Sequence, residues 1–404
     1  MSATKPRFGH FLGSNDDVLW EKNTPSEERL RTNAQIDLGA NPLLFMMPQP
    51  WMGSIRKFTR ALALDMDVAA AEGRPEQVLD DLEAICLLAN LVSDPPLIVT
   101  QLLGDAMRML AAERFGRELA QYPGLFSVAQ LDRAAAILTR ASAHGQIDLE
   151  WEKRATQDLA QRVFSDDGYG DGLMTIEGWN LLTELAGKQK WGREMIILVG
   201  PLVAKAWGTR SQFDQFLNRV FQDSSTEANK APWERTRSWL NKFESEVNSN
   251  DAPRSSFIVF ASVPAIPKAF AARSSAQMEL RAVVAAIAAE RFRLEHSRFP
   301  RNDMEMSSAM GKAPPVDVFD GNAIRFRFSE DELTIYSVGA DRVDNGGERA
   351  MDADAPRKWV HSEELLSLSK AQRDAMNGDW ILWPPNEVTW ADGSKHPLRV
   401  RVTK

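Results

Sequence analysis

The chain has 404 residues, enough for two or three domains, and its 44% apolar and 26% charged content is typical of a globular rather than a disordered protein. The formal net charge of −8 argues against nucleic acid as the main partner, because phosphate backbones require a basic surface. The single cysteine, Cys86, excludes an intramolecular disulfide and a cysteine-rich zinc site, and its apolar neighbours predict a buried thiol.

Targeting segments are not visible in the sequence. No stretch has the ~18 uncharged apolar residues of a membrane-spanning helix. The first residues, 1–10, lack the apolar run of a signal peptide. As written, the sequence therefore predicts a soluble protein without a signal peptide.

The first part of the chain reads as an irregular arm followed by a helical domain. Residues 1–50 are polar and then rich in proline and methionine, which predicts the arm. Apolar residues at helical spacing begin near Ile55, Gly73 and Pro75 break the run, and Ser127 with Gln130 forms a capping-box pattern. A helical domain over 51–250 follows from these patterns, with helices expected at about 55–72, 76–92, 97–115, 127–143, 149–164, 175–185, 191–207, 211–221 and 233–247.

In the C-terminal part of the chain, the spacing of apolar residues changes from that of a helix to that of a strand. One alanine-rich helix is expected over Ser274–Leu294, after which alternating apolar residues predict a hairpin of residues 323–328 and 333–336. A polar helix over 361–376 and a short β tail follow, with strands at 380–383, 388–390 and 398–402. The sequence thus predicts an α+β protein, divided into an arm (1–50), a helical domain (51–250), an α+β module (274–360) and a tail (361–404).

Several motifs in the module occur in a fixed order. They are Arg291–Pro300, Val316–Phe326, Tyr336–Asp341, Asn345–Glu348 and Asp352–Trp359. Together they resemble the globular domain of the major pseudopilin of type II secretion systems, with its helix and Tyr-Pro turn, its Asp-Pro-Trp/Phe-Gly segment and its Ser-Leu-Gly-Ala-Asp loop. The resemblance covers about a fifth of the chain; the helical region before it matches no family that we can name.

The resemblance implies a helix packed on a small antiparallel sheet, with a calcium ion ordering the last loop. Calcium binds six to eight oxygens from carboxylates and carbonyls, and such loops need glycines to turn those oxygens inward. By match to the family, Asp341 and Asp352 are the expected side-chain ligands, followed by Asp354. Asp344 supplies a further carboxylate without a clear family counterpart.

The sequence departs from the family pattern in several places. Arg342 stands where the family has glycine, and Val318 where it has proline. The family's leader and hydrophobic stalk are not in the sequence, and a helical region precedes the module. A solvated acidic turn without metal therefore remains an alternative for the loop. A second acidic loop, 165–172, resembles an EF-hand only loosely and is interpreted as a plain turn.

Catalytic patterns are not found in the sequence. The five histidines are scattered, and we find no zinc-protease, nucleophile-elbow, Walker or dinucleotide-binding motif. We therefore expect no catalytic residues and no organic cofactor, and interpret the chain as a non-enzyme. An unrecognised hydrolase, whose acids meet only in the folded chain, stays open.

Two main functional hypotheses follow. The first is a secretion-associated structural or interaction protein of the bacterial cell envelope, with a calcium-stabilised module and a protein partner. Because free calcium is scarce in the cytosol, this hypothesis requires an extracytoplasmic location and hence an incomplete N-terminus. The alternative is a helical-repeat adaptor that binds a peptide or protein without metal, which a concave apolar groove around 55–145 would favour.

Overall fold

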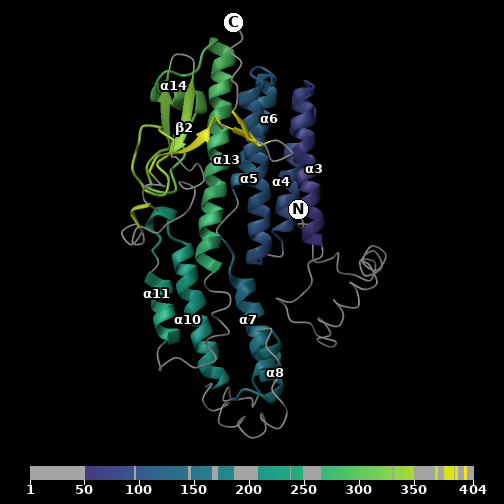
Figure 1. The fold of residues 1–404 in the computed structure, drawn as a ribbon, viewed down its shortest axis with the longest axis vertical. Helices are drawn as coiled ribbons and strands as arrows, with labels where there is room; N and C mark the ends of the chain where they lie inside the picture. Colours follow the sequence, from purple (N-terminus) through teal and green to yellow (C-terminus); the bar gives the residue numbers. More distant parts are fainter. Residues whose placement is uncertain are drawn as a thin grey trace, which may run out of the picture.

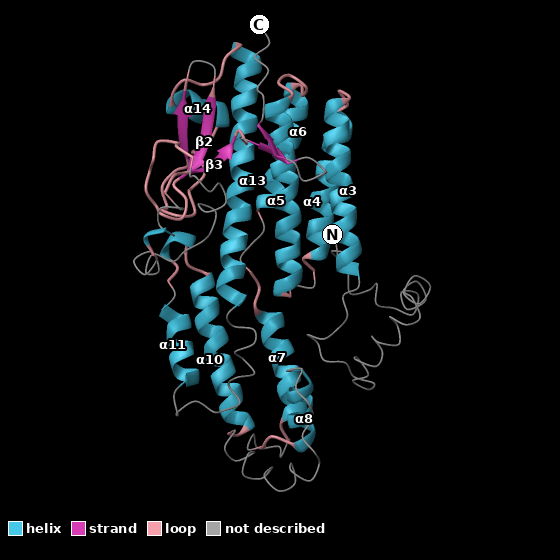
Figure 2. Ribbon diagram, viewed as in Figure 1, coloured by secondary structure: helices cyan, strands magenta, loops and turns pink. Residues whose placement is uncertain are grey.

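A computed structural model describes residues 51–94, 97–143, 147–165, 172–185, 208–236, 238–248, 265–329, 332–349, 369–371, 377–385, 387–389 and 395–397. Figure 1 shows an elongated arrangement whose helices run along the long axis, with strands beside one half of the longest helix (Figures 1 and 2). The predicted α+β class is confirmed, since the described chain is mainly helical with a small antiparallel sheet in its C-terminal part. The predicted arm and the predicted helix at 191–207 lie outside the described residues, as does most of the predicted helix at 361–376.

In the described part of the chain, the four helices that follow residue 50 contribute to the larger hydrophobic core, together with α13 and the sheet. Gly73, at a φ of 71°, ends the first of them, and Pro75 begins the second, as the sequence predicts. The predicted capping box is present: the Ser127 side chain accepts from the Gln130 N–H, and the Gln130 side chain accepts from the Ser127 N–H. The helices are α3 (Trp51–Ala71), α4 (Pro75–Val92), α5 (Ile98–Gln121) and α6 (Val128–Ser142).

Two glycines let α5 approach its neighbours closely. A Cβ on Gly104 would lie 2.1 Å from the Ser93 Oγ at the end of α4, and one on Gly116 would lie 3.1 Å from the Val283 side chain. Any larger residue at Gly104 would therefore push α4 and α5 apart. Because α5 packs on both sides, it is the central helix of this core.

A second core lies at the other end of the molecule. Its helices are α7 (Glu150–Val163), α8 (Ile176–Leu185), α10 (Arg210–Ala228) and α11 (Ser238–Asn248). The expectation of one helix over 233–247 is wrong, because a short 3₁₀ turn, η3 (Pro232–Glu234), precedes α11. The chain is extended at Arg235, whose guanidinium donates to the Ala228 carbonyl 3.0 Å away, and the Thr236 N–H donates to Glu227.

The long helix α13 (Ala265–His296) belongs to both cores. Ile266, Ala269 and Phe270 lie in the second core, whereas its residues from Met278 to Ala289 contribute to the first. The helix begins at Ala265, before the expected Ser274. Pro267 does not prevent this earlier start, because it stands in the first turn, where its missing N–H breaks no helical hydrogen bond. One helix therefore joins the two ends of the molecule (Figure 1).

Buried charges lie between the two cores, where α5 and α13 run side by side (Figure 1). Asp105 is 3% exposed, and its carboxylate accepts hydrogen bonds from Arg108, at 3.0 Å, and from Arg273. Both arginines are also buried. Because the two guanidiniums share this carboxylate, Asp105 compensates charge that would otherwise be costly in the protein interior.

The sheet packs on the second half of α13. The predicted hairpin is confirmed as β1 (Arg325–Phe328) and β2 (Leu333–Ser337), paired antiparallel with Phe328 opposite Leu333. The third strand, β3 (Trp380–Trp383), pairs with β2 and comes from the predicted tail. Between α13 and β1 lies α14 (Asp303–Met310), and a separate hairpin joins β4 (Glu387–Thr389) to β5 (Lys395–Pro397).

The described helices do not include a membrane span. None of them combines the length and the apolar character that crossing a bilayer requires.

Candidate functional site

The loops around β2 are built on one buried carboxylate, that of Asp317. Its side chain is fully buried, and its two oxygens accept hydrogen bonds from the Phe319 and Val338 N–H groups and from the Ser337 hydroxyl, at 2.9–3.0 Å. Arg325 approaches it to 3.1 Å. Burial raises the pKa of Asp317, and these donors offset part of the cost of the buried charge. Asp317 therefore ties the segment before β1 to the end of β2.

Arg325 connects three acidic side chains at the edge of the sheet. Besides Asp317, its guanidinium bonds to Asp320 and lies 3.5 Å from an oxygen of Asp344. The turn before β1 packs closely against Trp233. A Cβ on Gly321, in this turn, would lie 2.7 Å from the Trp233 ring. The loop region thus also contacts η3 of the helical part.

Two of the four predicted calcium ligands, Asp341 and Asp344, lie in the described loop after β2. One oxygen of Asp341 accepts from the Val343 N–H at 3.1 Å, and burial raises the pKa of this carboxyl. Asp344 accepts from the Tyr336 hydroxyl at 3.2 Å and from the Gly346 N–H at 2.9 Å. Burial and the nearby Asp344 charge raise the pKa of Tyr336 to about 12. Asp352 and Asp354 lie outside the described residues.

A further acid, Asp379, closes this loop from the chain just before β3. It is 1% exposed, and its carboxylate accepts from the Gly347 N–H at 2.7 Å and from the Asn345 N–H at 3.3 Å. Its own N–H donates to the Glu348 carbonyl at 2.7 Å. Burial raises the pKa of Asp379 to about 6, and the charges of Asp344 and Asp341 add to this shift. No motif in the sequence indicates a role for this residue.

The described acids fit a calcium ion unequally. Asp341 fits best, since its described hydrogen bonds are to backbone N–H groups and a carboxylate offers about four acceptor positions. Asp344 fits less well, because a guanidinium, a hydroxyl and an N–H already surround it. Within the described ranges, no three acidic, histidine or cysteine side chains converge as a metal-binding group. A calcium site at this loop would therefore centre on Asp341.

Arg342, where the pseudopilin family has glycine, adopts a backbone conformation that favours glycine. Its φ is 60°, in the left-handed region, which costs a residue with a Cβ about 1–2 kcal/mol. We expect the free energy of unfolding of Arg342→Gly to exceed that of Arg342→Ala by about 1 kcal/mol. Glycine removes the strain of the left-handed conformation, and this gain outweighs the greater conformational entropy that glycine gives the unfolded chain. Both variants remove the guanidinium, so the comparison isolates the backbone. Urea unfolding measures the difference, and equal stability of the two variants would contradict the expectation.

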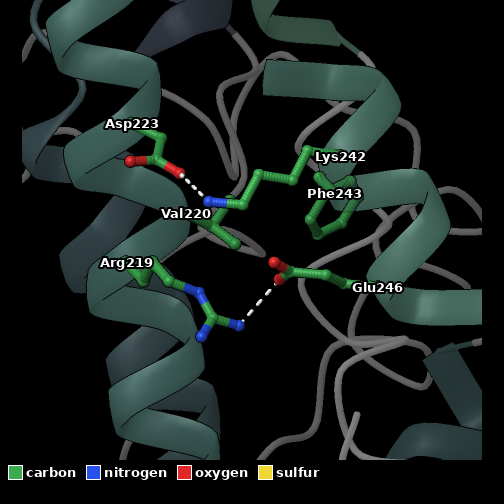
Figure 3. A pocket seen from close by; sticks show the side chains of 6 residues that line it. All are labelled: Arg219, Val220, Asp223, Lys242, Phe243 and Glu246. Carbon is green, nitrogen blue, oxygen red and sulfur yellow. Dashed lines mark hydrogen bonds and ion pairs between the residues drawn. The ribbon is translucent and has the colours of Figure 1, made fainter. Parts of the chain in front are cut away.

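Elsewhere, a hollow lies between α10 and α11 (Figure 3). Val220 and Phe243 line it, and two ion pairs cross it, Arg219 with Glu246 at 2.7 Å and Lys242 with Asp223 at 3.7 Å. The charges in the hollow cancel in pairs, so they favour neither an anionic nor a cationic ligand. We interpret these pairs as links between the two helices.

Comparisons with models of protein families, with curated proteins and with solved structures give no match. The residues of the loop and the sheet are therefore the basis for proposing a function.

Asp317 lies in a motif of the sequence that gave it no role, whereas no motif indicated Asp379. Asp317 stands between two valines, and an acid inside an apolar run is a signal for a buried, bonded carboxylate. Asp379 follows Asn377 and Gly378, which reads as an ordinary turn, and its partners lie more than 30 residues earlier. No local pattern indicates that pairing.

Proposed function

We propose that the chain is a non-enzymatic structural or interaction protein of the bacterial cell envelope, associated with secretion. In this proposal, α13 and the sheet correspond to a pseudopilin-like unit whose acidic loop is ordered by calcium. The observation that carries the proposal is the loop itself: a glycine-rich turn with Asp341 follows β2 directly, and β2 packs against α13.

The hydrogen bonds of the buried acids support a structural role. Asp317 and Asp379 both accept from backbone N–H groups of loops, and Asp317 also contacts Arg325. A carboxylate so engaged holds a loop in one shape. Such rigid loops are suited to presenting a fixed surface to a protein partner.

Calcium would stabilise the part of this loop in which negative charges lie close together. Asp341 and Asp344 both raise the pKa of Asp379, so negative charges accumulate on the turn. A divalent cation at Asp341 would offset this repulsion. Because the affinity of such a site suits calcium concentrations outside the cytosol, the proposal includes an extracytoplasmic location.

A thermal melt of the full chain in EDTA and in millimolar calcium tests the proposal. A ligand that binds the folded form alone, at 100 times its Kd, adds about 2.7 kcal/mol to the free energy of unfolding, which raises Tm by several degrees. We expect this rise in the natural chain and its loss in Asp341→Ala. Asp303→Ala, an exposed acid at the start of α14, is the matched control and should keep the full rise.

Absence of a calcium-dependent rise in Tm would contradict the metal site. A rise that persists in Asp341→Ala would place the ion elsewhere. In the first case the adaptor hypothesis, in which the helices bind a peptide or protein without metal, becomes the better account.

A further inference from the structure

Helix α3 lies beside α4 and α5 (Figure 1), and at each contact an acid of α3 lies next to a buried acid. Toward α4 the acids are Asp65 and Asp81. Toward α5 they are Asp67 and Glu118. Asp81 is 4% exposed, and Glu118 is 2% exposed. Two ionised carboxylates repel each other strongly where little water is present, so each contact needs a cation or a proton between the acids.

The contact with α5 contains two cations. The Arg117 guanidinium donates to Asp67 and to Glu118, and Arg114 donates to Asp67 at 2.6 Å. Burial raises the pKa of Glu118 to about 8, while the charge of Arg117 lowers it and that of Asp67 raises it. Burial also raises the pKa of the nearby Tyr122 phenol. Because two arginines compensate two acids, the charges of this contact are balanced even when both acids are ionised.

The contact with α4 is held by an amide instead of a cation. The Gln77 side chain donates to Asp65 at 3.3 Å and to Asp81 at 3.2 Å, and no described arginine, lysine or histidine forms an ion pair with either acid. Among the described residues, the buried Oδ2 atom of Asp81 has no hydrogen-bond donor. Asp65 lies within hydrogen-bonding reach of the Asp81 carboxyl. A proton shared by the two acids would therefore join them and remove their repulsion.

The other charged groups around Asp81 do not replace this proton. Burial raises the pKa of Asp81, Gln77 lowers it, and the charges of Asp65 and Asp80 raise it further. Asp80 of α4 is exposed and pairs with Arg133 of α6 at 2.7 Å. The two arginines of α5 that reach α3 are bonded to the acids of the other contact. The described groups thus add negative charge to this contact without a counter-ion.

We propose that a proton shared by Asp65 and Asp81 holds α3 against α4, and that loss of this proton to solvent loosens α3 from the bundle. We call this pair of acids the α3 latch. Ionisation leaves two facing carboxylates with only the Gln77 amide between them. Because the pKa of Asp81 in the folded chain lies above its ordinary value of 3.8, the folded chain binds more protons than the unfolded chain. The contribution of the latch to stability is therefore complete below pH 3.8 and is lost as the pH rises through the raised pKa. This inference does not rest on the proposed calcium loop.

Hydrogen exchange of the full chain tests the α3 latch. It is followed by mass spectrometry from about pH 5 to about pH 9 and corrected for the intrinsic exchange rate. We expect the protection of the α3 amides to fall at least about tenfold over this range, since a pKa shift of one unit changes the equilibrium tenfold. The amides of α6 are the internal reference and should change much less. Protection of α3 that does not depend on pH, or that falls equally in α6, overturns the proposal.

Three variants assign the pH dependence to the α3 latch. Asp81→Asn should abolish it, because an amide donates to Asp65 at every pH. Asp65→Asn places the amide on the other helix and should abolish it as well, which gives a second test if one variant does not fold, as judged by circular dichroism. Glu118→Gln neutralises the equally buried acid of the α5 contact and is the matched control, which should keep the loss of protection. A pH dependence that persists in the folded asparagine variants, or that only Glu118→Gln removes, overturns the proposal.

Discussion

Replacing Asp105 by asparagine should lower the free energy of unfolding by about 3–5 kcal/mol. The carboxylate is 3% exposed and accepts hydrogen bonds from Arg108 and Arg273, which are 1% and 5% exposed. An amide of the same shape keeps the volume but removes the negative charge that both guanidiniums share. The loss is large because two buried guanidiniums lose the carboxylate that lies between them, whereas an exposed ion pair contributes little to stability.

Urea unfolding followed by circular dichroism measures this effect. The matched control is Glu150→Gln, which removes an exposed carboxylate 3.0 Å from Arg154 one helical turn away. We expect that change to alter stability by less than about 0.5 kcal/mol. A loss below 1 kcal/mol for Asp105→Asn would contradict a central role of this carboxylate in joining α5 to α13.

Replacing Trp383 by alanine should lower the free energy of unfolding by about 3–5 kcal/mol as well. The side chain is 4% exposed, and its indole N–H donates to the Gly116 carbonyl of α5 at 3.1 Å. Its ring also contacts Phe299 edge-on, with centroids 5.9 Å apart. Truncation therefore leaves a cavity where β3, α5 and the loop after α13 meet.

Two further variants separate the contributions of Trp383. Trp383→Phe keeps an aromatic ring but loses the N–H donor, for which we expect a loss of about 1–2 kcal/mol from the hydrogen bond and reduced packing together. Trp151→Ala removes a tryptophan that is 36% exposed on α7 and should cost less than about 1 kcal/mol. Equal losses for Trp383→Ala and Trp151→Ala would contradict the view that the sheet and the first helices share one core.

Local signals predicted much of the fold. Gly73 with Pro75 gives the break between α3 and α4, and Ser127 with Gln130 gives the start of α6. The β1–β2 hairpin followed from alternation across a short turn. In each case the residues that specify the structure are neighbours in the chain, so their pattern is visible in the sequence.

Long-range contacts were not predictable in this way. The pairing of β3 with β2 joins residues more than 40 positions apart, and no periodicity specifies such a partner. The early start of α13 was missed because Pro267 reads as a break, although a first turn tolerates it.

In the candidate site, too, local motifs were visible in the sequence and long-range contacts were not. Asp341 was accessible to sequence reasoning because a motif surrounds it, whereas the contacts of Asp379 with Asn345 and Gly347 depend on the folded chain. Asp344 was predicted as a ligand, and the structure places it beside Arg325 and Tyr336, which makes it the weaker candidate.

Calcium binding measured directly is the sharpest test of the proposed function. Equilibrium dialysis of the full chain against calcium, with magnesium as competitor, reports the number of ions bound and their affinity. We expect one calcium ion per chain, displaced poorly by magnesium, and no saturable binding in Asp341→Asn. Saturable binding that is unchanged by Asp341→Asn, or no binding to the natural chain at millimolar calcium, would contradict the proposal of a calcium-ordered loop.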